Sequence, residues 1–358
     1  STLMRSSAAS DVYKRQKYRS SNIELYRIIV MLFIVSHHYL VNSGLLPIIE
    51  NLTPPRVMNC RLRCVFFYLF GMWGKTGINC FVLITGYFMC KSQITLRKFL
   101  KLLLQIEFYN ILINAVFVLT GYRSFGLNVL YEMFWPIKSV ADGFTSCFLL
   151  FYLCIPFLNA LVHNLDRKRH LALIGLCLFI YTVLGTTLRI RVTMNYVTWF
   201  CVLYFISSYI RMYGLEYGNL KIRWGWMSLI SIVISAASVL VFSTMTETPG
   251  REFFLVADSN HIMAVITSVC MFMYFKDLPI RNSRLINTVA SCMFGVLLIH
   301  ANSDTMRQWL WCDMLDNVGW FATDYAVVHA LASVAGIFVV CVVIDFLRQK
   351  FVEEHLFK

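Results

Sequence analysis

Charged residues are scarce in this chain of 358 residues: Asp, Glu, Lys and Arg together make up 14%, whereas 58% of the residues are hydrophobic. An ordinary soluble domain carries more charge than this, so the composition excludes one. In a lipid bilayer only helices and closed barrels satisfy every backbone polar group, and the long continuous apolar runs favour helices. The composition therefore predicts an all-α, polytopic integral membrane helix bundle.

Metal and redox motifs are also lacking. The twelve cysteines are scattered, mostly within apolar segments, and form no CxxC pair. We interpret most of them as small core residues and expect no metal site. Cys60 and Cys64 can pair only if their loop faces an oxidising compartment. The net charge of +13 does not indicate nucleic acid, because Lys and Arg of a membrane protein collect in its cytoplasmic loops.

About ten segments approach the roughly 20 residues that a helix needs to cross a bilayer. Their limits are 23–45, 75–92, 96–120, 143–163, 170–189, 195–213, 223–243, 258–276, 285–303 and 323–347. Two further apolar and aromatic stretches, 62–73 and 127–140, are too short and are expected at the membrane interface.

The loops and the first residues set further expectations. Most loop Lys and Arg residues fall on one side of this layout, which predicts that both termini lie in the cytoplasm. Residues 1–16 do not resemble part of a fold, and we interpret them as a non-native leader. Residues 17–358 are expected to form a single transmembrane domain.

The first apolar run, 22–40, carries the clearest candidate for chemistry. On a helix, Arg27 and His38 lie within roughly 20° of the same face and roughly 16 Å apart along the axis. Ionisable groups on one face of a membrane helix are costly unless they face a polar cavity. His is the usual general base near neutral pH, so His38 is the candidate base, with His37 off that line. The alternatives are a His pair that packs at the helix end and a Glu24–Arg27 salt bridge that anchors the helix start.

A second segment, GKTGINCFVLITGYF (74–88), combines glycines with polar residues. Its glycines allow close approach of helices, and Asn79 and Tyr87 are candidates for lining a cavity. Packing explains most of the segment without a substrate. His300 ends another long apolar run and is a further candidate for the cavity wall, although a lone His in such a place is more often structural.

Basic residues gather at the start of the third predicted span, where Arg97, Lys98 and Lys101 lie close together. Clustered cations can hold the phosphates of a nucleotide-bearing donor. They are also what a cytoplasmic membrane anchor shows. Further along the same helix, Glu107 shares a face with Asn110, and a buried Glu in a membrane helix indicates cavity lining.

Together these features resemble the acyltransferase 3 family of integral membrane acyltransferases. The Arg27-to-His38 spacing is similar to the Arg-x10-His signature of that family, and the order and spacing of the other segments fit from about residue 22 to 350. The segments that carry the resemblance are GKTGINCFVLITGYF (74–88), FLLFYLCIPFLN (148–159), VTWFCVLYFISSYIRMY (197–213) and FGVLLIH (294–300).

The resemblance implies a ten-span bundle in a bacterial inner (plasma) membrane. It implies transfer of an acyl group, usually acetyl from acetyl-CoA, to a hydroxyl of a carbohydrate or glycolipid acceptor of the cell envelope. His38 and Arg27 would match the essential pair of the family. Lys98 and Lys101 occupy the place of its Arg-x-x-Arg element, which would meet the phosphates of the acyl-CoA donor. No metal is implied.

Two rival interpretations stay open. A transporter, flippase or glycan polymerase also uses many helices with polar residues in the midplane, although no inverted repeat is visible in the sequence. An inactive partner of an envelope-glycan complex would explain why Lys replaces Arg in the basic element, and why the Trp and Glu common in the fourth span of many members are not evident here.

Overall fold

The computed structural model describes residues 20–52, 61–186, 190, 192–215, 222–245 and 251–356. Over these residues the chain forms helices and no strand, which confirms the all-α class. The expected leader at 1–16 and Cys60 of the suggested cysteine pair lie outside the described residues.

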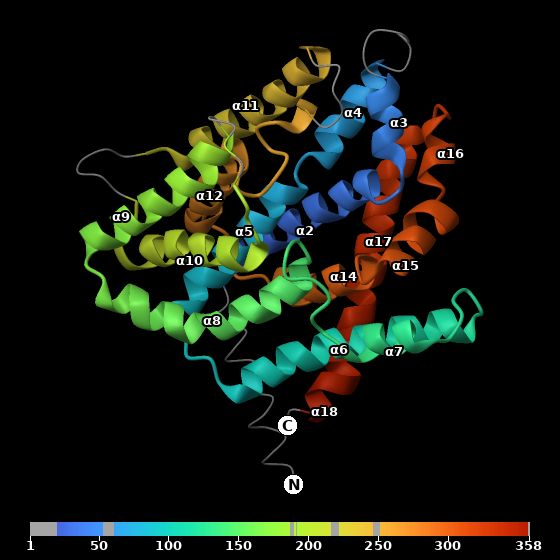
Figure 1. The fold of residues 1–358 in the computed structure, drawn as a ribbon, viewed down its shortest axis with the longest axis horizontal. Coiled ribbons are helices and arrows are strands. Elements are labelled where there is room, and N and C mark those ends of the chain that lie inside the picture. Colours follow the sequence, from blue (N-terminus) through green and yellow to red (C-terminus); the bar gives the residue numbers. More distant parts are fainter. Residues whose placement is uncertain are drawn as a thin grey trace.

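Figure 1 shows the helices in their order along the chain. The α-helices are α2 (Ser21–Val41), α3 (Leu45–Leu52), α4 (Arg61–Gly71), α5 (Gly74–Met89), α6 (Leu96–Leu119), α7 (Leu127–Phe134), α8 (Phe144–Asn164), α9 (Arg167–Leu178), α10 (Tyr196–Tyr213), α11 (Trp224–Met245), α12 (Ile262–Asp277), α13 (Arg284–Ser291), α14 (Met293–His300), α15 (Asp304–Arg307), α16 (Asn317–Phe321), α17 (Ala326–Arg348) and α18 (Glu354–Leu356). Other helical turns are the π-helical η1 (Phe179–Leu184), η3 (Gln308–Met314) and η4 (Gln349–Glu353), and the 3₁₀ turn η2 (Arg251–Phe253).

Each of the ten predicted spans contains a helix, but the count of about ten membrane spans is not confirmed. Within the described residues, six helices are long and apolar enough to cross a bilayer, or up to seven if the pair Arg284–His300 and Asp304–Met314, bent by 94°, is one span. Length accounts for part of the difference, because α9 has 12 residues and α12 has 16, fewer than the roughly 20 that span the hydrocarbon core.

The short 62–73 stretch does not stand apart from the next predicted span. Instead, α4 continues into α5, and Leu62–Met89 together form one candidate span of 28 residues. The 127–140 stretch does contain only a short helix, α7, which is eight residues long.

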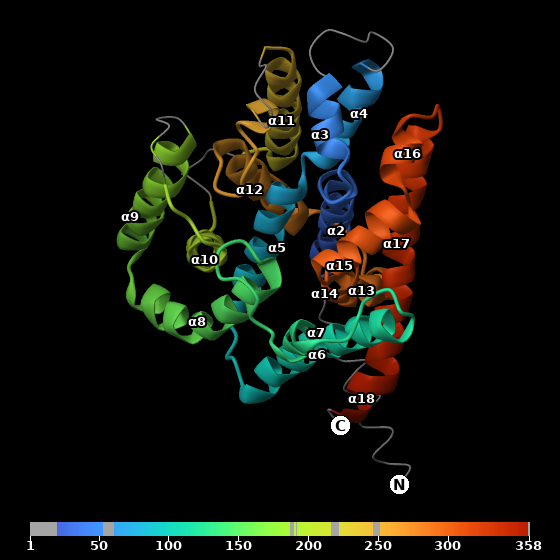
Figure 2. The same cartoon turned by 45° about the vertical axis from the view of Figure 1, so that its right-hand side comes forward.

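Helix α2 lies in the middle of the bundle. It packs against α4, α5, α12, α13, α14 and α17, and Figures 1 and 2 show α8, α9 and α10 on one side of it and α17 on the other. One hydrophobic cluster includes buried residues from α2 through α17. A side chain on α2 therefore meets partners from both halves of the chain.

The glycines of α4 and α5 let α2 come close to them. A Cβ atom on Gly71 would lie 2.3 Å from Leu40, one on Gly74 would lie 2.1 Å from the His37 ring, and one on Gly77 would lie 2.9 Å from Ile34. These three positions follow one face of the continuous α4–α5 unit. Only glycine fits at these positions. The close contact therefore fixes the position of the C-terminal half of α2 relative to α4 and α5.

The bundle has two distinct ends. We call one of them the basic end. There the start of α2 lies beside the last residues of α5 and α12 and the first residues of α13. The start of α6 contacts η4 at the same end. Contacts that define it are Arg27 over the Phe88 ring, Arg211 with Tyr87, Asn22 with the Lys276 carbonyl, Ser21 with Asn287, and Lys101 with Glu353. The predicted concentration of cations on one side is consistent with this arrangement.

Candidate active site

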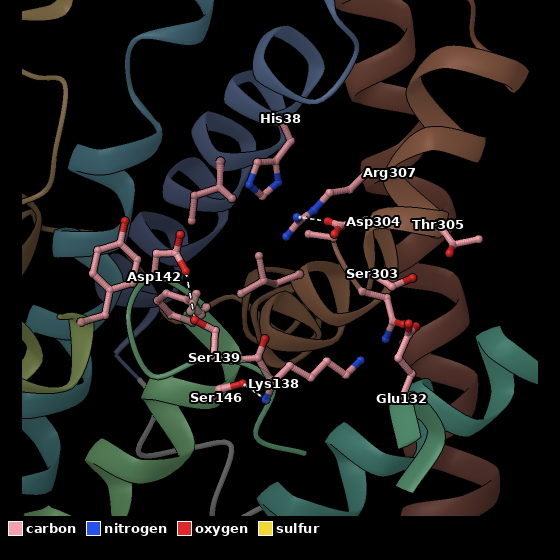
Figure 3. A pocket seen from close by; sticks show the side chains of 18 of the residues that line it. His38, Glu132, Lys138, Ser139, Asp142, Ser146, Ser303, Asp304, Thr305 and Arg307 are labelled. Carbon is pink, nitrogen blue, oxygen red and sulfur yellow. Dashed lines mark hydrogen bonds and ion pairs between the residues drawn. The ribbon is translucent and has the colours of Figure 1, made fainter. Parts of the chain in front are cut away.

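A polar cavity of about 750 Å³ lies at the opposite end of the bundle, which we call the cavity end (Figure 3). It is formed where α2 and α14 end, where α5, α8 and α15 begin, and where α7 and the 135–143 loop cover them. The polar residues in its wall are His37, His38, Lys75, Arg123, Asn128, Tyr131, Glu132, Lys138, Ser139, Asp142, Thr145, Ser146, Tyr196, Asn302, Ser303, Asp304, Thr305 and Arg307.

His38 lies in this wall and is bonded to a second histidine. Its Nδ1 is 2.9 Å from Nε2 of His300, and Nδ1 of His300 is 2.6 Å from the Val296 carbonyl oxygen. A carbonyl oxygen only accepts, so His300 must donate from Nδ1, which leaves its Nε2 as an acceptor when the ring is neutral. His38 then donates from Nδ1, and its Nε2 carries the lone pair. The pair therefore presents one basic nitrogen on the His38 ring.

The neighbouring His37 has a different environment. Its Nδ1 is 2.7 Å from the Gly71 carbonyl oxygen, and its ring lies against Gly74. It also contributes to the cavity wall. The close α2–α5 contact thus holds His37, and His37 in turn sets the rotation of the helix turn that carries His38.

Arg307 approaches His38 from the other side of the cavity. Figure 3 shows its guanidinium directed toward the His38 ring and joined to Asp304; that ion pair is 2.8 Å long. Both His38 and His300 lie within electrostatic reach of this charge. Nε of Arg307 is buried and has no hydrogen-bond partner among the described residues. A positively charged group therefore faces the His38 ring across the cavity (Figure 3).

The sequence matches the family Acyl_transf_3, described as an acyltransferase domain, over residues 20–346. The chain belongs to the acyltransferase 3 family. No curated protein and no solved structure matches it. Membership in this family, together with the apolar helices, supports membrane acyltransferase activity and an integral membrane location.

Lys75 and Tyr196 form the cavity wall on the side of α5. Nζ of Lys75 donates to the Tyr196 hydroxyl at 2.6 Å and lies 3.7 Å from Asp258. The ammonium is thus shared between α10 and the segment before α12. It adds positive charge to the wall next to His37.

The α7 side is held by a bidentate ion pair. Arg123 bonds both carboxylate oxygens of Glu132, at 2.7 and 2.8 Å, and these hydrogen bonds lower the pKa of Glu132. Figure 3 shows Lys138 extending toward Glu132. Burial lowers the pKa of Lys138, and the charges of Arg123 and Arg307 act in the same direction, whereas Glu132 and Glu107 oppose them.

Arg27, the other half of the Arg-x10-His signature of the family, does not lie in the described cavity wall. It is 3.5 Å from Glu24 and lies over the Phe88 ring at the basic end. The structure therefore shows the Glu24–Arg27 salt bridge that the spacing suggested. It places Arg27 and His38 at opposite ends of α2 and does not bring them together.

Asn79 and Tyr87, from the glycine-rich segment of the family, join helices away from this cavity. Nδ2 of Asn79 donates to the Ser259 carbonyl at 2.6 Å, and its Oδ1 accepts from Trp199 at 2.9 Å. The Tyr87 hydroxyl accepts from Arg211 at 2.8 Å at the basic end. Both side chains have structural partners, and neither lies in the described cavity wall.

The basic element of the family lies at the start of α6, at the basic end. Nζ of Lys98 donates to Ser92 at 2.8 Å and to the Gln93 carbonyl at 2.7 Å, and Lys101 pairs with Glu353. Arg97 belongs to the same helix turn. These three cations lie at the end of the bundle opposite His38, and they contribute nothing to the described cavity wall.

Glu107 and His300 lie closer to the predicted chemistry. His300 is completely buried and bonded to His38. Glu107 lies on α6 within electrostatic reach of Lys138 of the cavity wall, and both of its carboxylate oxygens are buried. Among the described residues, no three His, Cys, Asp or Glu side chains form a set of metal ligands.

Sequence reasoning missed four cations of the cavity wall: Lys75, Arg123, Lys138 and Arg307. Three of them are in segments that the charge pattern assigns to the cation-poor side of the membrane. A cation on that side departs from the usual bias of membrane loops. This departure from the usual charge bias is the sequence signal that could have indicated a functional role for these cations.

Proposed function

We propose that this protein is a membrane-bound O-acyltransferase that transfers an acyl group, in the first instance acetyl, from acyl-CoA to a hydroxyl of a cell-envelope or exported carbohydrate. The single observation that carries the proposal is the lone-pair nitrogen of His38, held by His300 and directed into a polar cavity. A general base positioned by a second group is what acyl transfer to a hydroxyl requires.

In the proposed reaction, His38 Nε2 takes the proton of the acceptor hydroxyl as its oxygen attacks the thioester carbonyl carbon. The tetrahedral intermediate collapses, the carbon–sulfur bond breaks, and the CoA thiolate leaves. The imidazolium then returns the proton to that thiolate. The products are the ester and free CoA, and His38 is again neutral.

Arg307 has the charge and the position to stabilise the intermediate. The thioester oxygen becomes negative when the carbonyl carbon is attacked, and donors directed at that oxygen contribute most where water is limited. The positive charge of Arg307 and the approach of its guanidinium to His38 (Figure 3) support this role. Arg27, which the signature of the family suggested for the cavity electrostatics, lies at the other end of α2.

The donor is proposed to dock with its CoA phosphates at Arg97, Lys98 and Lys101, and with its acyl group toward His38. Arg27 and His38 are eleven residues apart on α2, which corresponds to about 16 Å along the helix. The acyl-bearing arm would therefore extend into the bundle from the basic end. In the proposed orientation, the basic end and both termini face the cytoplasm of a bacterium and the cavity end faces outward.

The test is transfer from radiolabelled acetyl-CoA by the purified protein and by His38→Ala. General base catalysis typically contributes about 10²–10⁴-fold, so we expect transfer by His38→Ala to fall by at least about 10² while the protein still inserts and accumulates. His163→Ala, an exposed histidine at the end of α8, is the matched control and should keep full activity. Full activity in His38→Ala rejects the mechanism, and carbohydrate transport without consumption of thioester rejects the enzyme.

A further inference from the structure

A second hollow lies between α2, α11 and α12. It is a crevice of about 600 Å³ with a mostly apolar wall, and it shares no wall residue with the His38 cavity. Helix α12 packs against both α2 and α11, and Ile29, Leu229 and Met271 represent the three helices in the wall. Most of α11 is exposed on the outside of the protein, and Leu229 is itself exposed. The crevice therefore opens to the lipid.

The length and level of the crevice match one leaflet of the bilayer. Its wall runs along α11 from Arg223 to Ile232, which corresponds to about 14 Å, close to half of the roughly 30 Å hydrocarbon core. A Cβ on Gly225 would lie 3.3 Å from the Tyr274 ring, so α11 begins beside the end of α12, at the basic end. Arg223 directly precedes α11, and Trp226 is 60% exposed. Arg and Trp at a helix start mark the membrane interface.

Two polar groups in the wall lack partners. The Arg223 side chain is exposed and has no ion pair or hydrogen bond among the residues that the structure describes. The Ser228 hydroxyl is buried in the wall, and no described residue bonds to it. Ser228 lies about 7 Å further along α11 than Arg223.

The order of these groups matches the chemistry of a glycerophospholipid. A guanidinium donates strongly to phosphate, and a hydroxyl can donate to an ester carbonyl, which only accepts. From Arg223 inward, the crevice thus offers a partner for a phosphate, a partner for an ester and then an apolar path for an acyl chain. A lipid has these three parts in the same order.

The charge around the entrance favours an anionic headgroup. Arg281 and Arg284 follow α12 at the same end and are exposed, whereas the carboxylate of Asp277 is already paired with Lys276. Basic pockets between membrane helices bind anionic headgroups in this way. The ammonium of a zwitterionic headgroup would be repelled by the same cations.

We propose that the crevice between α2, α11 and α12 binds one anionic glycerophospholipid from the leaflet at the basic end. Its phosphate bonds to Arg223, an ester carbonyl accepts from Ser228, and one acyl chain lies between Ile29 and Leu229. The lipid then fills the space between α11 and the helix that carries His38. This inference does not depend on the proposed function, because it concerns a different site.

The experiment counts bound lipid by native mass spectrometry on protein that has been stripped of lipid in detergent. Phosphatidylglycerol and phosphatidylethanolamine with identical acyl chains are titrated into wild type, Arg223→Gln and Ser228→Ala. One equivalent of phosphatidylglycerol should bind wild type about tenfold more tightly than phosphatidylethanolamine does, and Arg223→Gln should remove this preference. Ser228→Ala should weaken the binding of both lipids about fivefold. Lys168→Gln, which removes an exposed cation at the start of α9, is the control and should bind as wild type does.

A photoreactive group on one acyl chain of phosphatidylglycerol locates the bound lipid. Labelling should concentrate on peptides that contain Ile29, Leu229 or Met271 and should fall in Arg223→Gln. Equal affinity of wild type for the two lipids overturns the proposal, and so does labelling spread evenly over the lipid-facing helices. Affinities that neither Arg223→Gln nor Ser228→Ala changes also overturn it. Thermal unfolding of each variant identifies one that has not folded, and the other variant then decides.

Discussion

Two imidazoles from positions 262 residues apart in the chain share one hydrogen bond at the cavity. His300 is completely buried and anchored to its own helix through the Val296 carbonyl. It therefore holds the His38 ring in one orientation and in one tautomer. In the proposed mechanism His300 positions the base, and it need not touch the substrate.

We expect His300→Ala to lower kcat by about 10²-fold, because a small displacement of a catalytic group has an effect of that size. His300→Gln should retain more activity, because its amide oxygen can accept from Nδ1 of His38. The KM for the donor should change little in both variants. The measurement is steady-state transfer from labelled acetyl-CoA. If His300 had only a packing role, the variants would lose stability, but their kcat values would not fall in the order wild type, His300→Gln, His300→Ala.

The two histidines also show what the sequence could and could not predict at this scale. The sequence predicts His38 as the candidate base, because of its spacing from Arg27 and its place at the end of an apolar run. The partnership with His300 depends on α14 packing beside α2, which periodicity does not encode. Arg307 follows a break between helices, so its approach to His38 could not be predicted from helical spacing either.

At the scale of helices, the glycine face of α4 and α5 determines where His38 lies. Substituting Ala for Gly74 would place a Cβ 2.1 Å from the His37 ring, and the helices would have to separate. Overpacking of this kind costs about 1–3 kcal/mol, so Gly74→Ala should lower the midpoint of thermal unfolding. It should also lower kcat, because His38 moves with the displaced turn.

Gly336→Ala is the matched control for that variant. Gly336 lies within α17, and an added Cβ there would meet no atom within 4 Å. Because Ala favours a helix over Gly by about 1 kcal/mol, the control should unfold at the same temperature or slightly higher. Equal midpoints and equal rates for Gly74→Ala and wild type would show that the contact does not position the base.

The helices themselves were more predictable than the number of membrane spans. Continuous apolar runs mark all ten segments, and a helix forms in each. An apolar run does not, however, distinguish a helix that crosses the bilayer from one buried by its neighbours. Helix α10 is the clearest example, because most of its 18 residues are buried within the protein.

At the scale of the whole molecule, the two ends differ in chemistry. The basic end joins helix starts and ends through Arg27, Arg211 and Lys101, whereas the cavity end holds the two histidines and Arg307. A donor that carries phosphates and an acceptor that carries hydroxyls would meet different ends of the same bundle. The proposed reaction therefore requires that the two ends face opposite sides of the membrane.

We predict that the loop at Pro279, at the basic end, faces the cytoplasm and that the loop at Ser124, at the cavity end, faces outward. The physical reason is the retention of Lys and Arg on the cytoplasmic side during insertion. The measurement is an epitope tag inserted at either position and probed with antibody in intact and in permeabilised cells. The tag at Ser124 should be detected in both, and the tag at Pro279 only after permeabilisation. The reverse pattern would place the His38 cavity on the cytoplasmic side, and acyl transfer would then have to occur before the carbohydrate is exported.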